Sequence, residues 1–373
     1  MTILIPNRAK GGSALFVLPS DTMGGAERVA AMLAEEAARS GQFGQVTVYV
    51  MCYEPLGSLE YLKEIPGCNI IVVYGRARRE AFGISGFVCF VLGKKFDFVF
   101  TTHTHVNAMC AFLRRIYLLR TNRLVTREST MIFDYDFGWA TNKVVGFLNI
   151  FYGSQDIIIC QTRLMANRYN KNTNSRLMSK IRLIPNPISQ RRMQKDLSVS
   201  IASTLLPQTR GPKIVWCGRF IDSKRPLLAI QTLASLHGLG HKDAKLIMIG
   251  DGPLLSSAVE EIKRLQLQDS VCLMGFQSNP ISIMAHCDYG LLTSNVEGFP
   301  NVILEMLTAG VKRVVTTNCA GDLDTVPGVV VSQKMEALTL AKDLASVLKL
   351  PRHKEVDAHL ATRDISLFLT KLL

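Results

Sequence analysis

Short apolar runs alternate with longer amphipathic stretches through the first half of the chain. Runs rich in β-branched and aromatic residues, typical of strands, are found at residues 14–18, 45–51, 69–73, 97–102, 123–126 and 156–160. Apolar positions with helical spacing are found between them at residues 26–40, 81–92, 106–119 and 162–169. This alternation predicts a parallel sheet wrapped by helices, since parallel neighbours need a crossover connection.

The same alternation begins again after a polar and basic stretch. Residues 189–211 have little periodicity and follow Ile184-Pro185-Asn186-Pro187, so they predict a linker. Strands are then predicted at 214–217, 245–249, 270–274, 289–292, 313–316 and 329–331, and helices at 226–237, 254–265, 280–286, 301–309 and 335–347. We therefore expect an α/β protein with domains at 1–187 and 213–352, a linker at 188–212, and one C-terminal helix at 353–373 that packs back on the first domain.

Composition narrows the class of protein. The 373 residues are 48% hydrophobic and 20% charged, which favours two folded domains over a disordered chain. A formal net charge of +13 favours an anionic partner, such as nucleic acid, lipid headgroups or a phosphorylated substrate, although a solvated basic surface has the same charge.

The nine cysteines form no Cys-x-x-Cys pair, which argues against a metal site and favours a reducing compartment. No signal peptide is recognised, and the longest apolar stretch, 81–93, is shorter than the ~20 residues of a membrane span, so we expect a cytoplasmic protein.

The strongest candidate for chemistry is the segment from Glu297 to Glu305, which follows a predicted strand. Ligands of open α/β sheets bind at the carboxyl ends of strands. Pro300 suits the first turn of a helix, and free backbone amides from Phe299 to Asn301 would form an anion site fit for a diphosphate. The two glutamates can accept hydrogen bonds from sugar or ribose hydroxyls. The alternative is a capped surface helix with two solvated glutamates.

Three more loops follow predicted strands of the second domain. Gly218, Arg219 and Lys224 follow the first of these strands, and two cations there can neutralise a diphosphate. Gly252 belongs to a Gly-Asp-Gly-Pro loop that lets the backbone approach a ligand closely, and Phe276 follows the next strand. Each loop alone is also compatible with an ordinary turn or surface charge.

The first domain carries weaker signals. Gly24 and Gly25 open its first predicted helix and permit backbone contact with phosphate or sugar oxygens. His103 and His105 follow a strand, where a histidine can bond a sugar hydroxyl or assist proton transfer, although such a pair also occurs in purely structural roles.

Taken together, these segments resemble glycosyltransferase family 4, the retaining enzymes of the GT-B fold. Glu297 to Glu305 is similar to the family's Glu-x7-Glu motif, and Gly218-Arg219 with Lys224 to its diphosphate-binding motif. The resemblance implies two Rossmann-like domains facing across a cleft, the first binding the acceptor and the second the nucleotide sugar. It further implies a retaining, metal-independent hexosyltransferase without a cofactor, acting on a glycan or lipid-linked acceptor in lipopolysaccharide or cell-surface polysaccharide synthesis.

The resemblance also implies roles for the candidate residues. Arg219 and Lys224 would stabilise the leaving diphosphate, Glu297 would hold the donor sugar, and His105 would contact the donor sugar or the acceptor. The other donor-binding candidates are Gly24, Gly25, Gly218, Gly252, Phe276, Phe299, Pro300, Asn301 and Glu305. His103 and Arg127, the latter in a Thr-Arg-Glu-Ser segment similar to one in some bacterial members, are acceptor-side candidates.

Basic residues of the first domain raise the question of a membrane. The segment 108–123 mixes apolar residues with Arg114, Arg115, Arg120 and Arg123, and Arg76, Arg78 and Arg79 add charge. Such a face is suited to docking on the anionic inner surface of a membrane, whereas a core helix with a wet basic edge is the alternative.

Other classes of protein fit the sequence less well. An epimerase-like GT-B enzyme would share the fold but release free sugar or a changed donor without an acceptor. A nucleic-acid-binding protein is suggested by charge alone, because no recognisable motif accompanies it. An NAD-dependent oxidoreductase lacks support, since no Gly-x-Gly-x-x-Gly follows the first strand.

Overall fold

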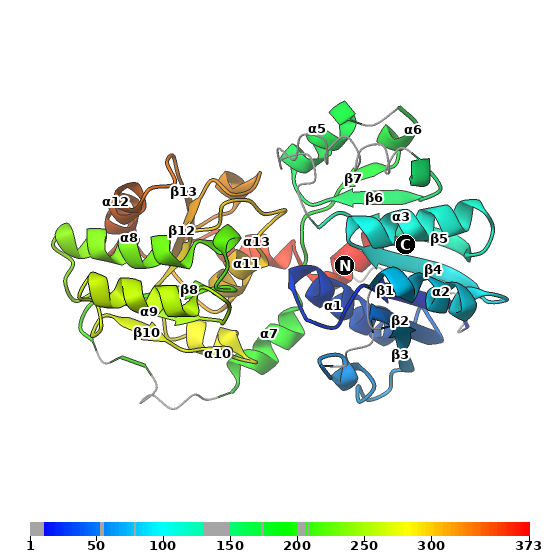
Figure 1. Ribbon diagram of the computed structural model, residues 1–373, viewed down its shortest axis with the longest axis horizontal. Helices are drawn as coiled ribbons and strands as arrows, with labels where there is room; N and C mark the ends of the chain where they lie inside the picture. Colours follow the sequence, from blue (N-terminus) through cyan, green and yellow to red (C-terminus); the bar gives the residue numbers. More distant parts are fainter. Residues whose placement is uncertain are drawn as a thin grey trace. The chain divides into compact units, whose positions relative to one another are not determined.

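The structure is a computed structural model that describes residues 11–52, 56–77, 80–129, 150–172, 175–199, 206–207 and 209–373. The chain divides into two compact units. The first contains Met1–Pro187 and Ile365–Leu373, and the second contains Ile188–Asp364. Each unit has one parallel sheet, as the alternation of strands and helices predicts (Figure 1).

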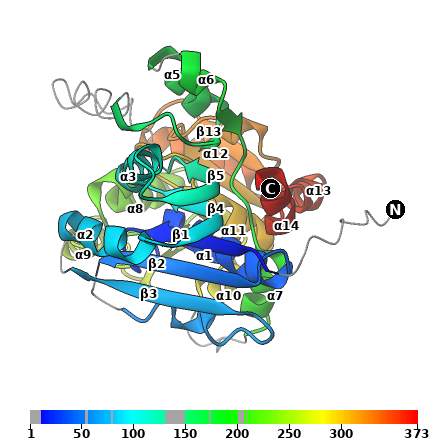
Figure 2. The same cartoon turned by 90° about the vertical axis from the view of Figure 1, so that its right-hand side faces the viewer.

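The first unit has a seven-stranded sheet of order β3-β2-β1-β4-β5-β6-β7. Figure 2 shows the first five of these strands side by side in that order. The strands are β1 (Ser13–Leu18), β2 (Gln45–Cys52), β3 (Ile70–Ala77), β4 (Lys95–Thr102), β5 (Arg120–Arg127), β6 (Ile157–Cys160) and β7 (Ile181–Leu183). The helices are α1 (Gly25–Arg39), η1 (Glu60–Leu62), α2 (Glu80–Val91), α3 (Thr104–Arg115), α5 (Arg163–Asn172) and α6 (Ser175–Met178). The strand order changes direction at β1, between its neighbours β2 and β4.

Alternate residues of each strand point to opposite faces, so this sheet has two apolar faces. Phe16 and Val48 belong to the face covered by α1 and the C-terminal helix. Leu15 and Val99 belong to the opposite face, which α2 and α3 cover. The near-continuous apolar runs of β1 and β4 follow from this double burial.

The second unit has a six-stranded sheet of order β10-β9-β8-β11-β12-β13. The strands are β8 (Lys213–Cys217), β9 (Lys245–Ile249), β10 (Val271–Leu273), β11 (Tyr289–Leu292), β12 (Arg313–Thr317) and β13 (Val329–Ser332). The helices are α7 (Gln190–Leu197), η3 (Asp222–Lys224), α8 (Pro226–Gly238), α9 (Leu255–Arg264), α10 (Pro280–Met284), α11 (Asn301–Thr308), η4 (Leu323–Thr325), α12 (Ala337–Val347) and α13 (Val356–Ala361). One face of the sheet packs against α8, α9 and α12, and the other against α7, α10, α11 and α13.

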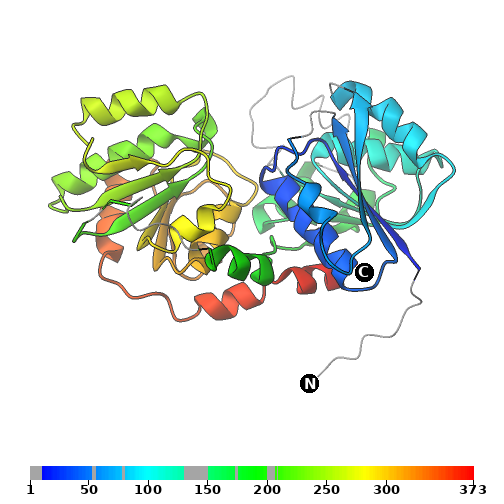
Figure 3. The same cartoon turned by 90° about the horizontal axis from the view of Figure 1, so that it is seen from below.

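The last part of the chain differs from the single helix expected at 353–373. It forms two helices, α13 and α14 (Ile365–Leu372), and Asp364 between them makes a parallel bridge with Ile188. The break has a packing reason. The buried Val356 and Leu360 of α13 belong to the core of the second unit, whereas α14 buries Phe368 in the core of the first. Only α14 packs back on the first unit, beside α1 (Figure 3).

Several short elements were not predicted, among them α7 and β7. The stretch expected to be a linker at 188–212 contains α7, which packs against α10 and buries Met193 in the second unit's core. α7 has few apolar positions within a polar and basic stretch, so no apolar run marked it, and its docking supplies the stabilisation that its own sequence lacks. The strand β7 is three residues long, and its Leu183 is exposed, so no apolar run marked it. Within the described residues, no helix is both long and apolar enough to traverse a membrane.

Candidate functional site

The predicted motif residues of the second unit lie on loops that follow four neighbouring strands, β10, β9, β8 and β11. The strands are parallel, so these loops all leave the same edge of the sheet. Phe276 follows β10, Gly252 follows β9, Gly218, Arg219 and Lys224 follow β8, and Glu297 to Glu305 follows β11.

The loops after β8 and β9 are packed against each other through their backbones. Gly218 N donates to Ile249 O at 3.0 Å, and Phe220 N donates to Asp251 O at 2.8 Å. Gly250 has a φ of 134°, and a Cβ at this position would lie 1.9 Å from Gly218 O. A residue with a side chain cannot occupy position 250 without moving the β8 loop, so this glycine sets how closely the two loops approach.

Lys224 is the last residue of η3, and its side chain reaches the loop after β11. Its Nζ lies 2.6 Å from Glu297 Oε1, and Ser294 Oγ donates to the same oxygen at 2.5 Å. The Lys224 side chain is 27% exposed and that of Glu297 is 13% exposed, so the pair lies at the surface edge of the core. The structure thus joins two candidate residues that are 73 positions apart.

The loop between β11 and α11 is hydrogen-bonded to the segment that follows β12. Glu297 N donates to Cys319 O at 2.7 Å, and burial raises the pKa of the Cys319 thiol to about 12. Pro300 is the N-cap of α11 with φ −78°, and the helix begins at Asn301 as predicted. Phe299 is 6% exposed, with the Arg363 guanidinium 5.4 Å from its ring centroid.

The remaining candidates in this unit differ in exposure. The Arg219 side chain is exposed, and within the described part of the chain it makes no ion pair. Phe276 is 74% exposed, which is unusual for a large aromatic side chain, and it follows Gly275 with its φ of 64°. Glu305 is partly buried on α11, eight residues after Glu297 as its motif requires.

The first unit brings together residues from the carboxyl ends of β1 and β4, which are neighbouring strands. Gly24 is the N-cap of α1 and Gly25 its first residue. His103 has a φ of 73° and is the N-cap of α3, and its Nε2 lies 3.4 Å from Glu27 Oε1. His105 is exposed one residue into that helix, with its ring centroid 6.0 Å from that of His103. Glu27 was not among the candidates from the sequence, although it follows the candidate Gly25 by two residues.

Arg127 lies at the end of β5 but is only 2% exposed. Its Nη2 donates to Asn186 Oδ1 at 2.7 Å, in the segment where the chain leaves the first unit. Desolvation lowers the pKa of Arg127 to about 10, and the nearby carboxylates of Glu128 and Glu27 oppose that shift. In this structure Arg127 is therefore placed to hold the Ile184–Pro187 segment and does not present its guanidinium to solvent.

A buried network beside Arg127 was not expected from the sequence. Glu128 is fully buried and accepts hydrogen bonds from Tyr152 Oη at 2.6 Å and Asn107 Nδ2 at 2.8 Å. Thr104 Oγ1 donates to its other oxygen at 3.0 Å, at the first residue of α3. The network holds the start of α3, and hence the turn that carries His103. Its one sequence signal was the Thr-Arg-Glu-Ser segment.

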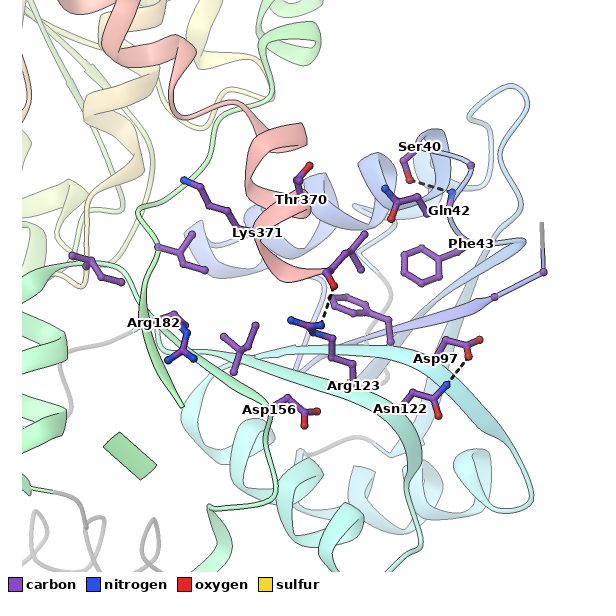
Figure 4. A pocket seen from close by; sticks show the side chains of 18 residues that line it. Ser40, Gln42, Phe43, Asp97, Asn122, Arg123, Asp156, Arg182, Thr370 and Lys371 are labelled. Atoms are coloured by element: carbon purple, nitrogen blue, oxygen red, sulfur yellow. Dashed lines mark hydrogen bonds between the residues drawn. The ribbon is translucent and has the colours of Figure 1, made fainter. Parts of the chain in front are cut away.

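A cavity of about 1570 Å³ also lies in the first unit, but at the opposite edge of its sheet (Figure 4). It is lined by Asp97, Asn122, Arg123 and Asp156, which belong to the amino ends of β4, β5 and β6 or precede them. Arg123 Nη1 donates to Leu373 O at 2.9 Å, as the dashed line shows. None of the motif residues lines this cavity, so its size does not identify it as the site.

No cluster of three His, Cys, Asp or Glu side chains able to hold a metal ion occurs among the described residues. Arg78 and Arg79, which were expected to add charge to the first unit, lie outside the described residues.

Two doubly covered parallel sheets, each with its candidate loops at the carboxyl edge, define a two-domain Rossmann-like protein of the GT-B class. Comparison with known proteins agrees with this assignment. The family model for glycosyl transferases group 1 matches residues 201–362, and that for glycosyltransferase family 4 matches residues 23–192. The chain belongs to glycosyltransferase family 4.

Individual relatives are distant. An uncharacterised glycosyltransferase of Methanocaldococcus jannaschii is 26% identical over 60% of this chain. The N-acetylgalactosamine-N,N'-diacetylbacillosaminyl-diphospho-undecaprenol 4-alpha-N-acetylgalactosaminyltransferase of Campylobacter jejuni is 27% identical over 63%. The chain spans 56% and 60% of the length of these two relatives. The Anabaena protein HepE, solved in complex with UDP, covers 96% of this chain and is itself covered to 98%, with a TM-score of 0.74 and 17% identity, so the likeness concerns the fold.

Proposed function

We propose that this chain is a retaining glycosyltransferase that moves a sugar from a nucleoside-diphosphate donor to a glycan or lipid-linked acceptor. The observation that carries the proposal is the convergence of Lys224 and Glu297, at 2.6 Å, beside the amino end of α11. A cation, a carboxylate and the positive amino end of a helix at one place are the groups that a sugar diphosphate requires. The family's two motifs provide them at the expected positions.

In this proposal the second unit stabilises the leaving group. Arg219 and Lys224 neutralise the diphosphate as the bond between the anomeric carbon and its oxygen breaks, and the positive amino end of α11 supports them. Glu297 holds hydroxyls of the donor sugar, and Glu305 holds the ribose. The route needs no metal, because the charge is met by fixed side chains and dipoles.

The acceptor attacks from the face that the diphosphate leaves. Its hydroxyl oxygen bonds to the anomeric carbon, and its proton passes to the departing phosphate oxygen, so the configuration is retained. His105 contacts the donor sugar or the acceptor in the first unit, and its ring centroid lies 6.0 Å from that of His103. That the residues binding the donor and the residues binding the acceptor line a common cleft stays a prediction.

The donor to be tested first is a uridine diphosphate sugar. HepE has been solved with UDP and with UDP-glucose, although the likeness to it extends only to the fold. The acceptor proposal is supported by the Campylobacter relative, whose name specifies a diphospho-undecaprenol acceptor. Both choices are starting points for this chain's own assay.

A membrane face on the first unit is also proposed, and the structure narrows it. Arg114 forms an ion pair with Asp156 at 2.5 Å, and Arg123 donates a hydrogen bond to Leu373 O. Neither cation therefore extends freely to a surface. Exposed side chains at the end of α3 and after it include Phe112, Ile116, Tyr117 and Ile150, together with Arg120 and with Arg115, which donates to Ile150 O at 3.1 Å. Exposed apolar and basic groups together suit an anionic headgroup layer.

Vesicle sedimentation tests this face. The wild-type chain is expected to sediment with vesicles containing phosphatidylglycerol and to stay in solution with phosphatidylcholine alone. The double variant I116S/Y117S should sediment less. Equal binding to both vesicle types would contradict the docking face.

The activity is tested by donor binding and by product analysis. UDP-, GDP- and ADP-sugars are screened for a raised melting temperature, because a ligand that binds only the native state stabilises it. The best donor is then incubated with candidate lipid-linked and free glycan acceptors, and the products are analysed by mass spectrometry. A product one sugar heavier than the acceptor is expected. An altered free donor without a transferred sugar would favour the epimerase-like alternative.

A further inference from the structure

A buried polar relay connects the strand-end loops of β8 and β11. Trp216 Nε1 donates to Thr293 Oγ1 at 2.9 Å, and Thr293 Oγ1 lies 2.8 Å from Lys224 O and 2.9 Å from Arg225 O. Trp216 is 1% exposed and Thr293 is fully buried. None of these contacts joins residues closer than 68 positions in the chain, so only the fold brings them together.

The hydroxyl of Thr293 has a single hydrogen, and its neighbours decide where that hydrogen points. The indole N–H of Trp216 can only donate, so it occupies a lone pair of the hydroxyl oxygen. The hydroxyl hydrogen is left to the two backbone carbonyls of Lys224 and Arg225. The relay therefore has one direction, from the indole through the hydroxyl to the main chain of the Lys224 turn.

That turn needs external support. The helix η3 has three residues, and Arg225 after it has a φ of 49°, a left-handed conformation that residues with a side chain adopt rarely. Asn295 N donates to Ser223 O at 2.8 Å and so ties the same turn to the loop after β11. Thr293 holds the carbonyl groups of Lys224 and Arg225, at the end of the turn. The Lys224 side chain extends from this turn to Glu297.

We propose that Thr293, oriented by Trp216, is a positioning residue that sets where the Lys224 ammonium stands. The inference rests on the proposed function, in which that ammonium stabilises the leaving diphosphate. Loss of the hydroxyl leaves the indole N–H and two carbonyls without their buried partner, and the turn shifts to find other partners. A displacement of a charge-stabilising group by about 1 Å is enough to cost about 100-fold in rate.

The principal variant is Thr293→Val, which keeps the shape of the side chain and removes its hydroxyl. Its kcat is expected to fall ~10- to 100-fold, with the KM for the acceptor unchanged. Thr293→Ser restores the hydroxyl and is expected to restore most of the rate. Thr232→Val is the matched control, because Thr232 is also fully buried in this unit and its hydroxyl donates to Leu228 O, within α8.

A double-mutant cycle with Lys224→Ala separates positioning from general destabilisation. If Thr293 acts through Lys224, Thr293→Val causes no further loss of kcat once the lysine is gone. The same loss in both backgrounds, or equal losses in T293V and T232V, would overturn the inference.

A spectroscopic arm needs no donor and so distinguishes failure of the relay from failure of the proposed function. The chain has two tryptophans, and Trp139→Phe leaves Trp216 alone. In ¹⁵N-tryptophan-labelled protein, the indole N–H of Trp216 is expected to shift and to exchange faster in T293V, but not in T293S or T232V. An unchanged indole resonance in T293V refutes the relay. An altered resonance in a protein that transfers no sugar refutes the transferase proposal and leaves the relay standing.

Discussion

The ammonium of Lys224 and the carboxylate of Glu297 form an ion pair with a separation of 2.6 Å. The carboxylate is also held by Ser294, so its position is set by two donors from different loops. In the proposed function, the donor's diphosphate gives Lys224 a second anion, while Ser294 still donates to Glu297. The pair thus keeps both side chains extended toward one place, which lowers the cost of ordering them when a ligand arrives.

Replacing Lys224 with alanine is expected to reduce kcat by ~100-fold, the value of one charge-stabilising group at a leaving anion. Steady-state kinetics with the best donor measure this. Arg264→Ala is the control, since Arg264 pairs with Glu261 on the exposed side of α9. Near-normal turnover by the Lys224 variant would contradict its assignment.

Arg219→Ala is expected to reduce turnover by ~100-fold as well, but without lowering the melting temperature. The reason is that Arg219 is exposed and makes no ion pair within the part of the chain that the structure describes. Kinetics and thermal unfolding are measured on the same preparation. A variant that unfolds earlier and transfers sugar normally would assign Arg219 to structure.

Gly250→Ala is expected to lower the free energy of unfolding by about 3 kcal/mol or more, because the new methyl group would meet Gly218 O and the φ is 134°. Urea unfolding, followed by Trp216 emission in a W139F background, measures the change.

Gly238→Ala provides the comparison for that prediction. Gly238 is the last residue of α8, and a Cβ there meets no atom within 4 Å. This variant is expected to stabilise the unit by about 0.5 kcal/mol. Equal effects of the two substitutions on the free energy of unfolding would show that the close approach of the β8 and β9 loops does not determine the cost of a side chain at position 250.

His359 predicts a pH dependence of the second unit's stability. Desolvation, and after it the charge of Arg363, lower the pKa of His359 below 6.5. Between the lowered pKa and 6.5 the unfolded chain binds more protons than the folded one, so stability is lost as the pH falls through this window. Urea unfolding at pH 7.5 and 5.5 is expected to show a larger loss for wild type than for His359→Leu. Identical losses would contradict the role of His359.

Much of the fold could be predicted because local patterns of apolar and turn residues along the chain determine it. The strands β9 and β11 begin and end at the predicted residues, and α11 begins at Asn301 as expected from Pro300. Burial on both faces of a parallel sheet demands continuous apolar runs, and these are visible without any knowledge of the partner strands. The motifs of the second unit were visible for a related reason, since each follows a strand directly.

Other features could not be read from the sequence because their cause is distant in the chain. α7 depends on docking against α10, and the break between α13 and α14 depends on two cores that receive different helices. Arg127 was an acceptor-side candidate, and only the tertiary structure shows that its side chain is buried and donates to Asn186.

The sequence by itself determined the two parallel α/β sheets, the loops at their carboxyl edges and the residue types available there, because periodicity and turn chemistry act over a few residues. The tertiary structure decided which of those residues meet. Lys224 reaches Glu297, and Thr293 links Trp216 to the Lys224 turn, because β8 and β11 are neighbours in the sheet. In the chain they are separated by two strands, β9 and β10, and by the helices η3, α8, α9 and α10. Pairings of this kind depend on the order of strands in space, which no local pattern of residues specifies.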